Sequence, residues 1–403
     1  MRRVIHLCVL VMLPIVSLSA ASDTLYRLPI GDPARKDRDV PITLDVLVDT
    51  ANGQRLTPDE LTTALASTRL LLLGESHTST EFHRVQLQVL RALRRAGRRV
   101  LVGLETYPYT EQGWLDRWNT GTLSEEAFVT GSRWYEHWGY HWNYYRDIFL
   151  FAREAGMPLH AVNAPREVIS AVRKKGFKDL TPEEAAHIPT DIDVESADHL
   201  AFFKASLTEG DTPHPGMSEE ALKGMLAAQA AWDATMGWNA AKALDRAEGR
   251  AAIMVVLVGS GHVAYGVGIE RQARRWVDGR ITSLVPVPVE DDGTPVTHAR
   301  ASYANFVYGV AGERHSAYPS LGISTVAAQD GRRVIDVQKK SPAGEAGIQA
   351  GDLLTSIDGH PAVSREQFNS VLAGKLWGDV VRLGLRRGDE SMAIEVGLRR
   401  IDE

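Results

Sequence analysis

The sequence of 403 residues contains a single cysteine and has only one long apolar run, over residues 4–18. Cys8 lies inside that run, which is too short to span a bilayer comfortably. If the run is removed on export, the mature protein has no cysteine. It can then form no disulfide, thiolate zinc site or thioether-linked haem, so His, Glu, Asp, Asn or Tyr must hold any metal.

The beginning of the chain predicts a secretory signal peptide over residues 1–21. Arg2 and Arg3 precede the apolar run, and Ser19 and Ala21 supply small side chains for cleavage. We therefore expect Sec-dependent export to the periplasm of a Gram-negative bacterium and a soluble mature chain. An uncleaved membrane anchor is the alternative.

The formal net charge is −6, and nothing in the sequence suggests the basic stripe that a nucleic-acid partner would need. Hydrophobic residues make up 44% and charged residues 24%, as in globular proteins. The length favours more than one domain. We expect an α/β domain over residues 22–290, a linker over 291–317 and a smaller domain over 318–403.

Strands and helices alternate in the larger region. Short apolar runs at residues 69–73, 99–104, 158–162 and 252–258 predict buried strands, and amphipathic helices lie between them. Thr78 with Glu81 predicts the capped start of one helix. The expected fold is a mostly parallel sheet flanked by helices, with a helical insertion over residues 165–250.

Polar side chains follow each of these strands. They are Glu75 and His77, Glu105, Asn163, and His262. Because ligands bind outside the carboxyl ends of parallel strands, we expect these side chains to converge. Two carboxylates and two imidazoles suit either a divalent transition metal or metal-free acid–base catalysis.

An aromatic block at residues 134–145 allows two interpretations, a packed lid or a flat apolar surface for a planar ligand such as haem. The sequence has no Gly-x-Ser-x-Gly or His-Glu-x-x-His motif, which argues against a serine hydrolase of the elbow type and a zincin.

The larger region resembles the ChaN family, which belongs to a wider group with Tiki, TraB and erythromycin-esterase proteins. The pieces that carry the resemblance are Leu72-Leu73-Gly74-Glu75-Ser76-His77, His83-Arg84-x-Gln86-Leu87, Gly103-Leu104-Glu105, Trp138-Gly139-Tyr140 with Tyr145, Ala161-Val162-Asn163-Ala164-Pro165-Arg166, Trp232-Asp233-Ala234-x-Met236 and Gly259-Ser260-Gly261-His262-Val263.

This resemblance implies haem binding and iron uptake, with paired haems held through tyrosine in a homodimer and a peripheral association with the outer membrane. The residues expected at the haem are Tyr140, Tyr144, Tyr145, His83, Asn163 and Arg166. The wider group implies instead a metal-dependent hydrolase or protease. Its catalytic and metal-binding residues would be Glu75, His77, Glu105 and His262.

The stretch from Ser341 to Gly359 resembles the central part of bacterial PDZ domains, with a strand over residues 353–357 and a helix over 365–372 capped by Ser364. Leu321-Gly322-Ile323 resembles the loop that binds a peptide carboxylate, and the strand after it would accept a peptide by edge addition. The expected partner is a C-terminal or extended peptide of another exported protein. A PDZ fold that only packs against the first domain is the alternative.

Three functions therefore compete: a haem- or iron-binding protein with a PDZ docking module, a metal-dependent hydrolase whose PDZ domain presents peptides, and a scaffold with a vestigial site. The family pattern favours haem binding, whereas the strand-end residues themselves favour acid–imidazole chemistry.

Overall fold

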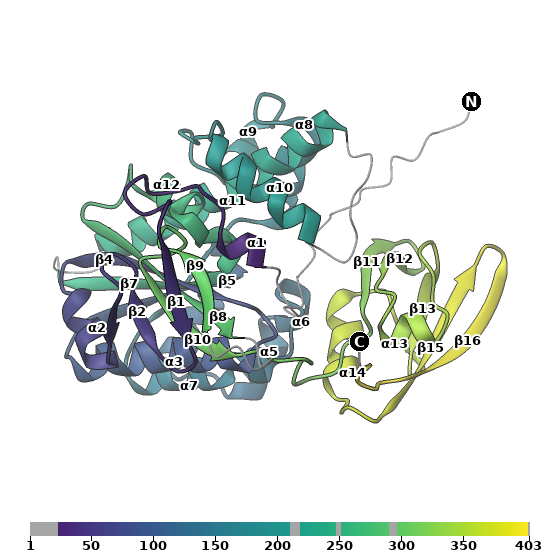
Figure 1. The fold of residues 1–403 in the computed structure, drawn as a ribbon. Helices are drawn as coiled ribbons and strands as arrows, with labels where there is room; N and C mark the ends of the chain where they lie inside the picture. The colour runs from purple at the N-terminus through teal and green to yellow at the C-terminus, as the bar shows by residue number, and fades with distance from the viewer. Residues whose placement is uncertain (1–22, 210–217, 247–250, 290–295, 402–403) are drawn as a thin grey trace. The chain divides into compact units, whose positions relative to one another are not determined.

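The computed structural model describes residues 23–209, 218–246, 251–289 and 296–401 (Figure 1). They fall into two units. An α/β domain contains the described residues up to Arg314 except Arg133–Trp142, and a C-terminal unit combines Arg133–Trp142 with residues 315–401. The predicted signal peptide lies outside the described residues. Among the described residues, no helix has both the length and the apolar character needed to cross a membrane.

An eight-stranded mixed sheet forms the centre of the α/β domain and confirms the predicted fold class. Six neighbouring strands are parallel to one another. In spatial order they are β10 (Phe306–Ala311), β8 (Arg280–Val289), β4 (Thr68–Glu75), β7 (Ala252–Gly259), β5 (Arg99–Pro108) and β6 (Leu159–Asn163). Beside β10, β2 (Leu47–Asp49) and β3 (Gln54–Leu56) run antiparallel, and β1 (Asp39–Thr43) pairs separately with β9 (Val296–Arg300).

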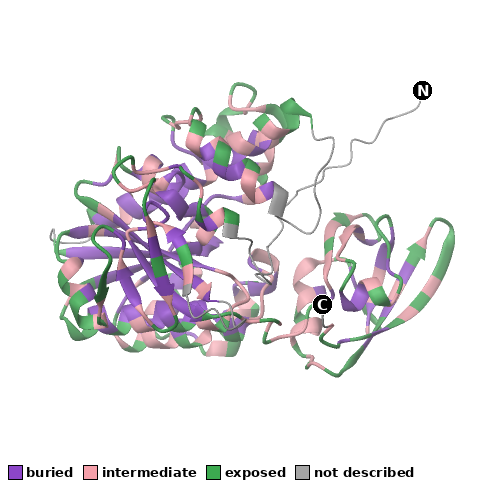
Figure 2. Cartoon of the chain, viewed as in Figure 1, coloured by how far each residue is buried: buried purple, intermediate pink, exposed green. Residues whose placement is uncertain are grey.

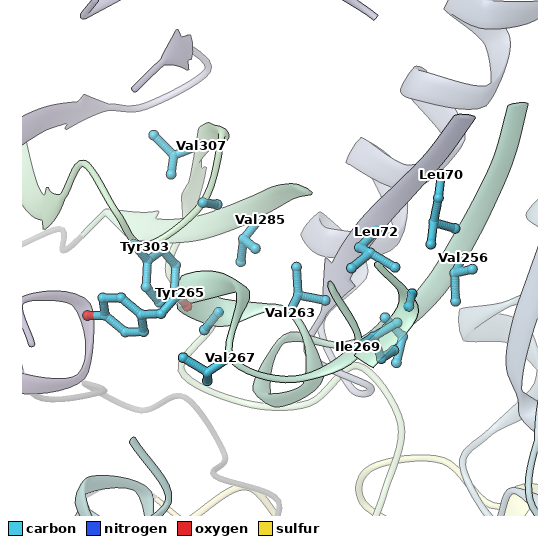
Figure 3. Close-up of a cluster of buried hydrophobic side chains, with 14 of the residues drawn as sticks. Leu70, Leu72, Val256, Val263, Tyr265, Val267, Ile269, Val285, Tyr303 and Val307 are labelled. Carbon is cyan, nitrogen blue, oxygen red and sulfur yellow. The ribbon is translucent and has the colours of Figure 1, made fainter. Parts of the chain in front are cut away.

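The central strands are buried along almost their whole length, because helices cover both faces of the sheet (Figure 2). Every residue of β7 is buried, as the continuous apolar run predicts. Side chains from β4, β7 and β8 gather with those of the turn after β7 in one hydrophobic core (Figure 3).

Helices pack on both faces of the sheet (Figure 1). α3 (Thr80–Arg95) and α7 (Arg146–Glu154) lie on one face, and α11 (Glu219–Arg246) and α12 (Ile269–Ala273) lie on the other. The predicted helical insertion comprises α8 (Arg166–Lys175), α9 (Pro182–Ala185), α10 (Ala197–Glu209) and α11. The remaining helices are α1 (Asp23–Tyr26), α2 (Pro58–Ala64), α4 (Gln112–Asn119), α5 (Glu125–Gly131), and the 3-10 turns η1 (Tyr109–Glu111), η2 (Trp142–Tyr144), η3 (Ser260–His262) and η4 (Ala264–Gly266).

Two predictions about this region were wrong. Residues 296–311 are not linker, because they form β9 and the inner strand β10, and the α/β domain continues to Arg314. Hydrophobic residues such as Phe306 and Val307 pack into the core there. The irregular sequence around them obscured this short apolar run. The N-cap of α3 is Ser79, whose hydroxyl accepts from the Phe82 amide, and not Thr78.

The C-terminal unit is built on a six-stranded antiparallel sheet. Its strands are β11 (Ile323–Ala328), β12 (Gly331–Val337), β13 (Leu353–Ile357), β14 (His360–Pro361), β15 (Val380–Arg387) and β16 (Glu390–Gly397). α13 (Pro342–Glu345), α14 (Arg365–Ala373) and, from the aromatic block, α6 (Trp134–His137) complete it. β11 pairs only with β12 among the described strands, so it is an edge strand. The predicted strand at 353–357 and the Ser364 cap of α14 are both present.

Candidate functional site

The predicted strand-end residues meet at one edge of the parallel sheet. Glu75 is the last residue of β4, His262 lies in the turn after β7, and Asn163 ends β6. Glu105 differs from the expectation, because β5 continues to Pro108 and Glu105 is part of the strand. Parallel neighbours end at the same edge of a sheet, and this brings together residues far apart in sequence.

Glu75 is a buried carboxylate that accepts three hydrogen bonds. Its partners are His77 Nδ1 at 2.7 Å, the Tyr145 hydroxyl at 2.6 Å and Gln86 Nε2 at 2.8 Å. Burial by itself would raise the pKa of Glu75. The charge of nearby His83 and the bonds from His77 and Tyr145 outweigh burial and lower this pKa to about 2. Glu75 is therefore ionised throughout the physiological range.

His83 completes the surroundings of Glu75 on the α3 side. It is buried, its Nδ1 lies 3.6 Å from a Glu75 oxygen, and its Nε2 lies 3.3 Å from the His77 carbonyl oxygen. The Tyr145 ring packs against it at 4.4 Å between centroids, and the Tyr144 ring at 5.8 Å. His83, predicted to face the site, does so because it lies one turn into α3.

A second imidazole–carboxylate group lies around His262. Its Nδ1 is 2.6 Å from an Asp233 oxygen, and its Nε2 is 3.5 Å from Glu105 Oε1. Burial alone would lower the pKa of His262, but the charges of Asp233 and Glu105 and the bonds to them raise it to about 10. His262 is thus an imidazolium between two carboxylates at neutral pH.

Gly259 brings these two groups together. Its amide donates to Glu105 Oε2 at 2.7 Å. A Cβ atom at this position would lie 3.2 Å from the His77 ring, which it would crowd, and 3.6 Å from the Glu105 carboxylate, an ordinary contact. Burial opposes the charged form of His77, yet Glu75 and Glu105 together raise its pKa. The His77 side chain is 17% exposed, whereas that of Glu75 is 1% exposed, so the site opens at His77.

Asn163 supports the site from β6. Its amide donates to the Glu105 carbonyl oxygen at 2.7 Å, and its side-chain oxygen accepts from the Trp232 indole and the Ala164 amide. Arg166, the first residue of α8, is half-buried three positions further on. Asn163 therefore holds β5 in position at Glu105.

Three residues of this network were not predicted as site residues from the sequence: Gln86, Gln229 and Asp233. Gln229 Nε2 lies 2.9 Å from His262 Nδ1, beside the Asp233 contact. A signal for two of them existed, because Gln229 and Asp233 are polar residues four positions apart in an alanine-rich helix, and thus on one face. Both are buried in α11.

The tyrosines expected to bind haem lie in different places. Tyr145 is buried beside Glu75 and Tyr144 beside His83, whereas Tyr140 belongs to the C-terminal unit. In the described part of the chain, no group of three or more His, Cys, Asp or Glu side chains is arranged to hold a metal ion. The metal-ligand roles of Glu75, His77, Glu105 and His262 stay predictions. The arrangement itself holds acid–imidazole pairs, which can orient a donor nitrogen or transfer a proton.

The predicted carboxylate loop of the C-terminal unit precedes β11. Leu321 is buried, and Gly322 has a φ of +71°. A Cβ atom at Gly322 would lie 2.2 Å from Ser341 Cβ, so only glycine allows this loop to close over Ser341. Ile323 then starts the edge strand beside which a peptide could lie.

Comparisons with known proteins agree with this architecture. A family model described as haem-binding uptake, Tiki superfamily, ChaN matches residues 61–272, and a PDZ domain model matches residues 319–398. No curated protein matches the chain.

Solved structures resemble the two units separately. ChaN of Campylobacter jejuni, in a structure titled for its cofacial haem binding, is 18% identical, and the match covers 65% of this chain and 95% of that one with a TM-score of 0.51. The PDZ domain of an SdrC-like protein from Listeria monocytogenes is 32% identical over 19% of this chain and 81% of that one (TM-score 0.17). A serine endoprotease from Yersinia pestis is 25% identical over 21% and 30% (TM-score 0.19).

The family model covers more than half of the sequence, and the α/β fold agrees with it. The chain therefore belongs to the ChaN haem-binding uptake family of the Tiki superfamily, with a PDZ domain following the α/β domain.

Proposed function

We propose that this protein is exported to the periplasm, binds haem at the sheet edge marked by Glu75 and His77, and docks the C-terminus of another exported protein through its PDZ domain. Membership of the haem-binding family is the observation that carries the proposal. The PDZ match supports peptide docking, and the sequence pattern of the first 21 residues supports export.

The donor set at this edge fits a haem iron through histidine. His77 Nδ1 is held at 2.7 Å by Glu75, which is the arrangement that orients the other ring nitrogen of a histidine towards a metal. His77 is also the more exposed partner of the pair. When bound, haem would supply an iron centre for uptake and transfer. Arg166 at the first turn of α8 suits a propionate.

Tyrosine ligation requires more rearrangement in this structure. The Tyr145 hydroxyl donates to Glu75, so it would have to leave that carboxylate to reach an iron, and Tyr144 is 6% exposed. We therefore propose His77 as the haem ligand, with Tyr144 and Tyr145 as an aromatic wall.

Titration of the purified full-length protein with hemin tests this proposal. We expect a saturable Soret band that His77→Ala weakens at least tenfold in affinity and that Glu75→Gln shifts. The matched control is His298→Ala, an exposed histidine of β9. A wild-type protein that gives only weak, unsaturable absorbance would end the haem proposal. Equal affinity in His77→Ala would reject the ligand assignment alone.

The second candidate is hydrolysis, and the Glu105–His262–Asp233 arrangement favours it. A carboxylate–imidazole pair backed by a second carboxylate is a proton-transfer device. His77, oriented by Glu75, would take a proton from water once deprotonated. Since its pKa is raised, activity would increase with pH above the ordinary histidine value. A peptidase or esterase screen between pH 6 and 10, with elemental analysis of the same sample, tests this candidate.

A further inference from the structure

Part of the aromatic block groups with the PDZ domain. Residues Arg133–Trp142, here called the aromatic segment, come between α5 and Asn143 in the sequence, yet they pack with residues 315–401. Within this unit α6 of the segment contacts α14. α14 is the helix that we expect to form one wall of the peptide groove.

α6 and α14 cap each other. The Glu136 amide donates to the Glu366 carboxylate at 2.6 Å, and the Glu366 amide donates to the Glu136 carboxylate at 3.0 Å. Each carboxylate therefore satisfies a backbone N–H in the first turn of the opposite helix, where acceptors and negative charge are favourable. This reciprocity fixes the position of α6 along α14.

Side chains of α14 also donate hydrogen bonds to the backbone carbonyl groups of the segment. The Arg365 guanidinium donates to the carbonyl oxygens of Glu136 and Trp138, each at 3.0 Å, and Asn369 Nδ2 donates to that of Tyr135 at 3.2 Å. A PDZ groove also forms hydrogen bonds to the main chain of its ligand, although there the backbone of an edge strand makes them. Arg365 and Asn369 lie on one face of α14, four positions apart.

Gly139 makes this close approach feasible. Its φ is +88°, and a Cβ atom there would lie 2.4 Å from Arg365 Nη2. Any other residue would combine an unfavourable backbone conformation with a collision. The Arg365 contact thus depends on glycine at this position.

The C-terminal end of the segment contacts a residue just before the predicted carboxylate loop. The His141 ring stacks on the Tyr318 ring at 3.8 Å with an interplanar angle of 3°. His141 Nε2 lies 3.0 Å from the carbonyl oxygen of Ala373, the last residue of α14. Tyr318 precedes Leu321 of that loop by three positions. The segment therefore extends from the first to the last residue of α14.

We propose that the aromatic segment is an internal competitor for the PDZ domain, which must leave α14 before a partner's free C-terminus can bind. Phe368 is buried in the PDZ core, and Val371 and Leu372 pack against that core. The segment binds the Arg365 and Asn369 side chains of the same helix. The inference rests on the peptide docking proposed above.

The test measures peptide affinity in the full-length protein. The probe is a fluorescein-labelled decapeptide that ends in a valine with a free carboxylate, and the same peptide with an amidated end is the specificity control. Glu136→Ala removes one cap, and Gly139→Val places a side chain against Arg365, while both leave the PDZ sequence unchanged. The matched control is Glu126→Ala, an exposed residue of α5.

We expect Glu136→Ala and Gly139→Val to bind the probe at least fivefold more tightly than the wild type and Glu126→Ala. Hydrogen exchange provides the second measurement. A saturating concentration of probe should increase exchange of the α6 amides in the wild-type protein by at least fivefold.

Equal or weaker affinity in both segment variants would overturn the competition. Unchanged α6 protection at saturating probe would also overturn it, because segment and peptide would then bind together. If the probe binds none of the proteins, including Glu136→Ala and Gly139→Val, the proposed peptide docking is wrong. The proposed competition is then wrong as well.

Discussion

The pairing of Asp233 with His262 gives a stability prediction that depends on pH. We would replace Asp233 with asparagine, which keeps the shape of the side chain and removes its charge. His262 lies 2.6 Å from Asp233, and both side chains are buried. Breaking a buried ion pair by removing one partner costs about 3–5 kcal/mol of unfolding free energy. We expect a loss of that order at pH 7 for the α/β domain.

The pH dependence provides the sharper part of the prediction. Burial opposes protonation, but Asp233 and Glu105 raise the pKa of His262 to about 10 in the folded protein, against an ordinary value of 6.5. The folded state therefore holds a proton that the unfolded state loses above pH 6.5. The stabilisation is fully present below that pH and declines by about 1.4 kcal/mol per pH unit until the folded pKa is reached.

Urea unfolding at pH 6, 7, 8 and 9, followed by far-UV circular dichroism, measures this slope. The wild-type midpoint for the α/β domain should fall from pH 7 to 9, and Asp233→Asn should start lower and change much less. The control is Asp245→Asn, an exposed residue of the same helix α11. Parallel curves for the wild type and Asp233→Asn would refute the reasoning, because His262 would then not keep its proton through Asp233.

Two further predictions concern Glu75 and the PDZ core. Tyr145→Phe removes a donor to Glu75, costs about 1.5–3 kcal/mol, and moves acid unfolding to higher pH. The stabilisation from Glu75 is present above its ordinary pKa of 4.5 and is lost as pH falls through about 2 in the wild type. Acid titration by fluorescence checks this, with Tyr308→Phe as control, and an unshifted acid midpoint would contradict it. Phe368→Ala opens a cavity in the PDZ core, and calorimetry should show a loss of about 3–5 kcal/mol in the PDZ transition alone. A shift in the α/β transition of similar size would contradict the separation of the two cores.

Much of the α/β domain follows from its sequence pattern. The apolar runs before Glu75 and before His262 are β4 and β7, which are buried on both faces, as continuous hydrophobic strands must be. The parallel order then forces their polar ends to one edge of the sheet. The strand β10 was missed because its residues follow an irregular stretch of sequence.

The residues that hydrogen-bond to the acid and imidazole side chains could not be predicted from the sequence in the same way. Asp233 lies in the middle of a long helix, and no local rule shows which turn of α11 faces the strand ends. The Glu75 environment likewise depends on Tyr145 and Gln86, which come from two different helical regions. Their roles depend on packing, because a hydrogen bond needs a partner within about 3 Å.

The sequence by itself determined the two domain types, the alternation that builds a parallel sheet, and the acid and imidazole residues at its edge. These properties depend on local periodicity and on motifs, which short stretches of chain carry. Tertiary structure alone decided which carboxylate pairs with which imidazole, and that Arg133–Trp142 packs with the PDZ domain instead of with its neighbours in the chain. The contact between Glu136 and Glu366 joins residues 230 positions apart, and such contacts depend on shape and charge that exist only after folding.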